Sequence, residues 1–342
     1  MKHLTKIILA VMLCLSLNAH TQTVGSTFKI GNATYKVTSN VYPNFEVAYC
    51  GPNISSVATG TNSITVPPTV TYNGDTYTIT SIESVGLTNN SEPRISFTIP
   101  NTVKYIHPNT VNGIRTIILE SGNTAYVLEN GLLMSKNKDR IVACEVGQTT
   151  DGYYNLTVPS SVKVIEASAF RLCEKIQSVS MSNVTEINKG AFQSCSNMTS
   201  AALNEGVVYI GDEAFYNCSK LKQITIPKSV TTLGTGLFYG CDSLKTMYYN
   251  AKKANENATN KTSNTVFYAP NLDKVIVGDS VELLPVFIFD ACTKITCVNF
   301  PNSLKKIGDF AFRGCNRITS LSFPENLEYI GWNSFSGAVS VA

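Results

Sequence analysis

The chain has 342 residues, of which 43% are hydrophobic and only 15% charged, and its formal net charge is +3. Two of the positive charges, Lys2 and Lys6, belong to a leader-like segment, and no run of basic residues follows it. Nucleic acid and anionic membranes are therefore not expected as partners, because both are bound mainly through clustered positive charge.

Residues 1–21 have the three parts of a secretory signal peptide: a basic start, the apolar run IILAVMLCLSL and the polar NAHTQT. Leu13 stands before Cys14, where a lipidated protein would carry a small residue, so the pattern favours plain export with cleavage after Ala19 or Thr21. The apolar run is too short to span a bilayer, and no later segment is long and apolar enough. We expect a secreted or cell-surface protein, of bacterial type, with no transmembrane segment in its mature form.

Residues 22–81 read as strands and turns, with hairpin signals at Gly31-Asn32 and Asn73-Gly74. We predict an N-terminal β cap that closes the first coil of a repeat array over residues 82–342, since an uncovered terminal repeat would expose its core. An irregular repeat follows, and then an insertion at 122–150, in which Asn130-Gly131 and residues 137–139 supply turns. We interpret this insertion as a β meander that protrudes from the array.

The regular array begins at Leu156. In LKQITIPKSVTTLGTGLFYGC, which starts at Leu221, apolar residues fall at offsets 0, +3, +5, +9, +12, +17 and +20, and Leu244 starts the next coil at +23. Phenylalanine recurs at +17, and a polar insertion at 250–264 lengthens one interval, from Phe238 to Phe267. A period of about 23 residues with this ladder predicts a β-rich leucine-rich-repeat solenoid, whose coils must stack to bury their apolar faces.

Each coil is expected to have three parts. The LxxIxI segment forms a strand that ends at a proline such as Pro227 or Pro301. The V-x-x-I-G segment forms a second short strand, with glycine at the corner. The Ala-Phe-x-x-Cys segment is interpreted as one helical or 3₁₀ turn on the far side.

The segments ITIPKSVTTLGTGLFYGCDSL, IPNTVKYI, VPSSVKVIEASAFRLC and FPNSLKKIGDFAFRGC resemble the BspA-like leucine-rich-repeat family, over roughly residues 79–337. Departures occur at Thr110-Val111, at Gly236-Leu237 and at Pro270, which replaces the cysteine. The resemblance implies an exported or surface-displayed protein of anaerobic bacteria or some protists, associated with adhesion to host proteins and other cells.

Ten cysteines in an exported chain suggest disulfides, but six of them recur once per coil at one core position. Stacked strands place equivalent side chains about 5 Å apart, wider than the roughly 3.8 Å that a disulfide prefers between Cβ atoms. We therefore predict buried free thiols at Cys173, Cys195, Cys218, Cys241, Cys292 and Cys315. Zinc is not expected, because the mature chain keeps at most two histidines.

No catalytic or cofactor-binding residue is predicted. Ser280, in a Gly-Asp-Ser sequence, matches Ser229 and Ser303 in the repeat, and no histidine stands at a plausible partner position. Asp212-Glu213 is interpreted as a solvated pair in a loop rather than an acid and a base, and His107 as a surface turn residue.

The outward strand position at +4 offers the candidate binding face. Its central residues are Thr225, Tyr248, Ile276 and Asn299, of which two are bulky and apolar on an otherwise polar sheet. We therefore expect a non-enzymatic binding protein for a host, neighbouring-cell or matrix protein, with only weak salt dependence because no basic cluster is visible. The alternative is a carbohydrate-binding accessory protein of a glycan-uptake system; an ordinary solvated face, or a site in the insertion at 129–144, also stays open.

Overall fold

The computed structural model describes residues 22–41, 43–52, 63–83, 95–108, 110, 113–146, 152–256 and 266–338. The predicted signal peptide lies outside these residues. The chain divides into two compact units, residues 1–111 with 115–128 and residues 112–114 with 129–342. The described part of both units is built from strands and turns, without helices.

The first unit contains the hairpins that the sequence predicts. One sheet has the order β1 (Thr27–Ile30), β2 (Ala33–Val41), β3 (Asn44–Pro52), β6 (Asp75–Ile82) and β5 (Thr69–Tyr72), and β8 (Tyr105–Ile106) also pairs with β6. Asn73 and Gly74 join β5 to β6 with positive φ angles of 51° and 89°, as a two-residue hairpin requires. Phe28 stacks on Tyr72 at 4.2 Å between ring centroids, and Tyr77 is fully buried beside it.

The same unit also holds a small parallel sheet of β4 (Ser63–Thr65), β7 (Ser96–Ile99) and β9 (Thr116–Leu119). Buried Asn123 fixes the chain after β9, because its side-chain amide donates to the carbonyls of Pro100 and Val103 while its oxygen accepts from the backbone of Tyr126. The unit ends within β10 (Tyr126–Glu129). That the β cap closes the repeat array stays a prediction.

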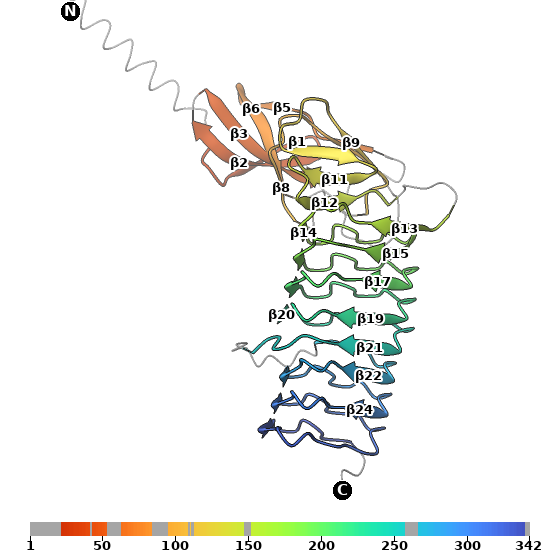
Figure 1. Cartoon of the computed structure of the whole chain (residues 1–342). Helices are drawn as coiled ribbons and strands as arrows, with labels where there is room; N and C mark the ends of the chain where they lie inside the picture. Colours follow the sequence, from red (N-terminus) through yellow and green to blue (C-terminus); the bar gives the residue numbers. More distant parts are fainter. Residues whose placement is uncertain are drawn as a thin grey trace, which may run out of the picture. The chain divides into compact units, whose positions relative to one another are not determined.

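The second unit is a β-solenoid in which long strands stack coil upon coil (Figure 1). They form one parallel sheet in the order β13 (Tyr154–Thr157), β15 (Ile176–Ser180), β17 (Ser200–Ala202), β19 (Gln223–Ile226), β21 (Thr246–Tyr249), β22 (Lys274–Val277) and β24 (Cys297–Asn299). The register advances by 22 or 23 residues per coil and by 28 across the insertion, where Thr246 pairs with Lys274. The predicted fold class, a leucine-rich-repeat solenoid with coils of about 23 residues, is confirmed.

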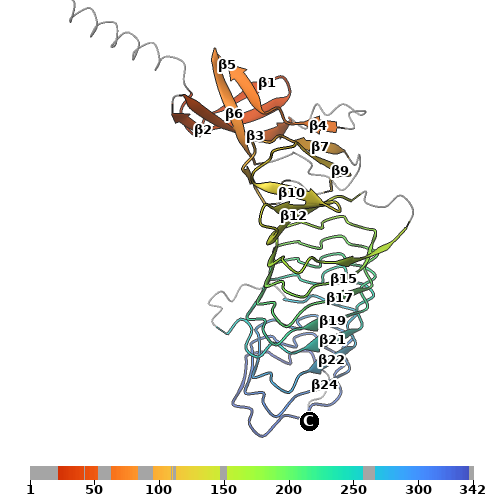
Figure 2. The same ribbon diagram turned by 45° about the horizontal axis from the view of Figure 1, so that its top comes forward.

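The predicted short strands stack in parallel along the coils and form a second wall, separate from the long strands labelled in Figure 2. They are β14 (Val164–Ile165), β16 (Glu186–Ile187), β18 (Tyr209–Ile210) and β20 (Thr232–Leu233), and then, in a separate sheet, β23 (Leu283–Leu284), β25 (Lys306–Ile307) and β26 (Tyr329–Ile330). Glycine follows several of these strands because the coils approach closely. A Cβ on Gly308 would lie 2.6 Å from the backbone nitrogen of Val286 in the preceding coil.

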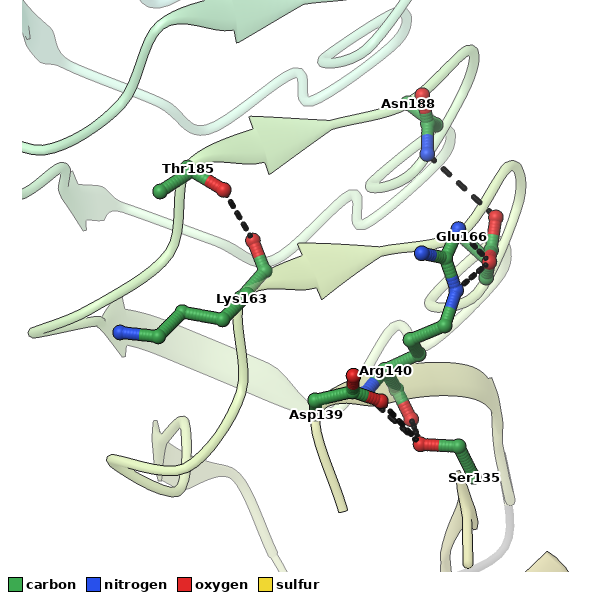
Figure 3. Close-up of polar contacts among 7 residues, drawn as sticks. All are labelled: Ser135, Asp139, Arg140, Lys163, Glu166, Thr185 and Asn188. Atoms are coloured by element: carbon green, nitrogen blue, oxygen red, sulfur yellow. Dashed lines mark hydrogen bonds and ion pairs between the residues drawn. The ribbon is translucent and has the colours of Figure 1, made fainter. Parts of the chain in front are cut away.

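The strands of the predicted meander form, but the insertion does not protrude from the array. Its hairpin of β11 (Leu132–Ser135) and β12 (Arg140–Cys144) joins the second wall, because β12 pairs in parallel with β14. Arg140 extends from the hairpin to Glu166 with an Nε–Oε1 distance of 2.6 Å, and Glu166 also accepts a bond from Asn188 of the next coil (Figure 3). Inside the turn of the hairpin, the Ser135 hydroxyl donates to Asp139. The insertion is therefore continuous with the solenoid.

The third wall contains isolated turns closed by bonds between residues three apart, and no helix forms where one helical or 3₁₀ turn was expected. Alternate N–H groups in Ala-Phe-x-x-Cys close short turns within the coil, as from Cys195 to the carbonyl of Phe192. The N–H groups between them donate to the next coil, as from Phe192 to Ala214 and from Phe215 to Leu237. Every wall of the solenoid is therefore a hydrogen-bonded ladder between coils. The turns have positive φ twice in most coils, at non-glycine residues such as Glu213 and Asn217 and at glycines such as Gly236 and Gly240.

The core is a column of phenylalanines at the predicted +17 position. Seven of them are fully buried: Phe170, Phe192, Phe215, Phe238, Phe267, Phe289 and Phe312. Neighbouring rings lie 5.0–5.7 Å apart between centroids, and most pairs are stacked. The phase of the sequence repeat is thereby confirmed.

A parallel column of buried cysteines runs beside the phenylalanines, as predicted, and the structure describes all six as free thiols. Several of these thiols donate a weak hydrogen bond to the backbone carbonyl of a phenylalanine in the preceding coil. The Sγ–O distance is 3.2 Å from Cys195 to Phe170 and 3.3 Å from Cys315 to Phe289. Burial raises the pKa of the Cys292 thiol to about 12. These side chains therefore act as small core residues that also join adjacent coils.

The polar insertion at 250–264 interrupts the second wall between β20 and β23. In its described part, which extends to Glu256, a side chain makes the hydrogen bonds to β20 that a neighbouring strand would otherwise make. The side-chain amide of Asn255 accepts from the N–H of Leu233 and donates to its carbonyl, both at 3.0 Å. A single amide therefore satisfies both backbone groups at the open edge of β20.

Candidate functional site

The structure brings the four predicted face residues into one row across four neighbouring strands. Thr225, Tyr248, Ile276 and Asn299 are successive register partners in β19, β21, β22 and β24. We call these four residues the central row. Alternation along each strand turns the neighbouring residues, such as Met247 and Val275, into the core. The central row therefore lies on the outer face of the sheet.

Tyr248 and Ile276 form the apolar centre of this row. The side chain of Tyr248 is 36% exposed, and Ile276 beside it is half-buried. Thr225 and Asn299 on either side are exposed, as are Ser180 and Ala202 farther along the same outward position. Stacked parallel strands lie about 4.8 Å apart, so the row offers a rigid apolar patch with polar ends.

A groove that sequence reasoning missed lies on the same sheet, next to the central row. It has a volume of about 620 Å³ and is lined by Lys245, Asn271, Asp273, Lys274, Lys294, Thr296, Cys297 and Arg317. We call it the basic groove, since four cations line it with one carboxylate. Lys274 and Cys297 precede Ile276 and Asn299 by two residues on the same strands, so the groove and the row share one face.

The expectation that the chain has no basic cluster is wrong at this groove. Its cations come from four successive coils and are 20 or more residues apart in the sequence. A scan for basic runs cannot find them. Projecting the charges onto the 23-residue period would have brought them together.

A family model described as the BspA type leucine-rich-repeat region matches residues 149–265 and 260–341 in six copies, which is more than half of the chain. The protein belongs to the BspA-type leucine-rich-repeat family. The resemblance stated from the sequence is thereby confirmed.

Solved structures of other leucine-rich-repeat proteins are similar to this chain. A leucine-rich repeat protein from Eubacterium ventriosum is 23% identical with a TM-score of 0.54, over 93% of this chain and 96% of that one. One from Bacteroides ovatus is 21% identical over 92% and 93%, with a TM-score of 0.40. A leucine rich cell surface protein from Faecalibacterium prausnitzii is 16% identical over 93% and 100%, also with 0.40. A comparison with curated proteins gives no match.

A second aromatic feature of this BspA-type solenoid lies on the turn wall and was also missed. Tyr216, Tyr239 and Tyr268 directly follow core phenylalanines and stack on one another at 5.1 and 4.7 Å between centroids. Tyr239 and Tyr268 are 44% and 38% exposed. Because the ring faces contact each other, mainly the ring edges and hydroxyls of this tyrosine ladder are presented to solvent.

Serine and aspartate side chains, which could serve in an active site, mostly form hydrogen bonds between neighbouring coils in this BspA-type solenoid. Ser229 and Ser303 donate to carbonyls of the preceding coil, whereas the buried hydroxyl of Ser280, at the same repeat position, has no hydrogen-bond partner among the described residues. Asp212 accepts from the N–H and hydroxyl of Thr235 in the next coil, which is a bond between coils rather than an acid–base pair. His107 is exposed, as predicted.

Over the described ranges, no group of three His, Cys, Asp or Glu side chains gathers as a metal site would require. The same part of the BspA-type chain contains no helix suited to crossing a membrane.

Proposed function

We propose that this protein is an exported, non-enzymatic binding protein that attaches to a protein on another cell or in a matrix through the central row. Membership of the BspA-type family supports a protein-binding role. The observation that carries the proposal is the alignment of Tyr248 with Ile276 in one outward row. Buried aromatic and apolar anchors near the centre of an interface supply most binding energy in protein complexes.

The rigidity of the coils favours this use of the face. Backbone hydrogen bonds join the coils on all three walls, and the fully buried phenylalanine column fills the interior. The outward side chains therefore keep their spacing without a partner. A preorganised surface loses little conformational entropy on binding, so a modest apolar patch can hold a partner effectively.

No observation favours the glycan alternative to the same degree. Sugars bind to proteins by stacking on a free aromatic face, and the tyrosine ladder uses its ring faces internally. Tyr248 is a single exposed ring on its sheet among smaller side chains. A glycan array therefore serves as the competing arm of the test.

The test is capture of matrix and cell-surface proteins by immobilised protein, beside a glycan array, followed by affinity measurements on variants. Tyr248→Ala with Ile276→Ser should weaken binding of the captured partner by about 2 kcal/mol, or roughly thirtyfold in Kd, and should leave the melting temperature unchanged. Tyr239→Ala with Tyr268→Ala is the matched control, because it removes two exposed tyrosines from another wall. If the control loses binding and the face variant keeps it, the proposed face is wrong.

A further inference from the structure

The basic groove has charge that the protein itself does not neutralise. Within the described residues, none of its four cations forms an ion pair with a carboxylate, although lysines elsewhere do, such as Lys252 with Glu282 at 2.9 Å. Lys245, Lys274 and Arg317 are exposed, and Lys294 is half-buried. Four positive charges against the single carboxylate of Asp273 leave a local excess of three.

The geometry of the groove follows from the repeat. One cation is contributed by each of four successive coils, and stacked strands lie about 4.8 Å apart, so the charges span roughly 15 Å along the solenoid. A single small anion would contact only a part of that length. The arrangement suits several anionic groups carried on one extended surface.

Two observations decide which kind of anionic partner fits. Asp273 lies among the cations, and a carboxylate there repels a uniform polyanion such as a sulfated glycan or a nucleic acid. The apolar centre of the central row is the second observation, because Ile276 is two residues from Lys274 on the same strand face. A protein surface can carry acidic side chains, a hydrogen-bond donor for Asp273 and an apolar contact together.

We propose that the basic groove receives a cluster of Asp and Glu side chains from the same protein partner that covers Tyr248 and Ile276. This inference rests on the proposed function and adds the charge of the partner to it. Carboxylates in the groove approach unpaired ammonium and guanidinium groups, which steers association and fixes the orientation of the partner on the face. Binding then depends on salt, since the Debye length falls from about 10 Å at 0.1 M salt to about 3 Å at 1 M.

The test uses two labelled peptides, one rich in Glu with two Leu residues and a counterpart with every Glu replaced by Gln, together with a heparin fragment. Fluorescence anisotropy measures each of them against the full chain. The Glu peptide should bind, the Gln peptide should bind about tenfold more weakly, and high salt should weaken only the former. Heparin binding without binding of the Glu peptide would overturn the proposal in favour of a sulfated glycan.

Charge reversal locates the site. Lys274→Glu with Lys294→Glu should weaken the Glu peptide about tenfold, whereas Lys189→Glu with Lys306→Glu changes the net charge equally on other walls and should have little effect. Equal affinity in both variants would overturn the proposal.

The partner captured through the central row separates the two ideas. If Tyr248→Ala with Ile276→Ser weakens its binding and the groove reversal does not, the proposed function stands and the groove proposal fails. If both variants weaken it, both stand.

Discussion

Phe215→Ala tests the structural premise of the fold, that a column of phenylalanine rings holds the coils together. The ring is fully buried and stacks on Phe192 at 5.4 Å and on Phe238 at 5.7 Å. Burying an aromatic ring removes about 150 Å² or more from water, which at about 25 cal/mol/Å² contributes about 4 kcal/mol. The substitution also removes two ring contacts, and partial collapse of the cavity recovers part of their energy. We therefore expect the free energy of unfolding to fall by about 3–5 kcal/mol.

Thermal unfolding followed by circular dichroism measures this loss. At about 2–4 °C per kcal/mol for a unit of this size, the melting temperature should fall by about 10 °C. Trp332 is the single tryptophan and lies 68% exposed near the end of the described residues, so its fluorescence reports on the last coils alone. Coincident transitions by the two probes would show that the coils unfold together.

Phe335→Ala is the matched control at the same repeat position. Phe335 stacks on Phe312 at 5.3 Å, but its side chain is only half-buried. Phe335→Ala should lower the free energy of unfolding by about half as much, because folding removes less of the Phe335 side chain from water. An unchanged melting temperature in Phe215→Ala, or equal losses in both variants, would refute the argument that the stacked column stabilises the solenoid.

Three other predictions concern the thiols and the insertion. The repeat cysteines should react with iodoacetamide only after denaturation, as mass spectrometry of the native and unfolded protein can show; disulfides in most of them would contradict it. Since burial raises the pKa of Cys292 to about 12 in the folded state, the urea midpoint should be constant below the ordinary thiol pKa of about 8.5 and fall as pH rises above it. Asn255→Ala should cost about 1–3 kcal/mol in urea unfolding, because it leaves both backbone groups of Leu233 without the amide; a loss below 0.5 kcal/mol would mean that water replaces it.

The sequence predicts the repeat well because burial selects residue types at fixed intervals. Only an apolar side chain can occupy the position of Phe215, and only a small one fits at Cys218, so the same types return in each coil. The hairpin around Asn73 is equally visible, because its backbone needs positive φ. The central row follows from counting outward from these buried positions.

Other features depend on pairings that a linear pattern does not contain. The Ala-Phe-x-x-Cys segment resembles a helical turn because some of its N–H groups bond to carbonyls three residues earlier. Its remaining N–H groups bond to the next coil instead, as that of Phe192 does to Ala214. Asn255 replaces a strand with one side chain. The hairpin at 132–144 gives no sequence sign that β12 will pair with β14. Each of these depends on which coil lies next to which.

The separation of inward and outward residues explains how one rigid fold can present a particular binding face. The buried columns set the register, so outward side chains can differ from coil to coil without changing the backbone. The four coils from Lys245 to Arg317 carry both the apolar centre of the central row and the basic groove. Folded Phe215→Ala protein, well below its melting temperature, should therefore bind the partner with unchanged affinity. Tyr248→Ala with Ile276→Ser should instead keep the melting temperature and bind the partner more weakly. The opposite pattern would mean that the face and the core are coupled, and that binding energy is spread through the coils.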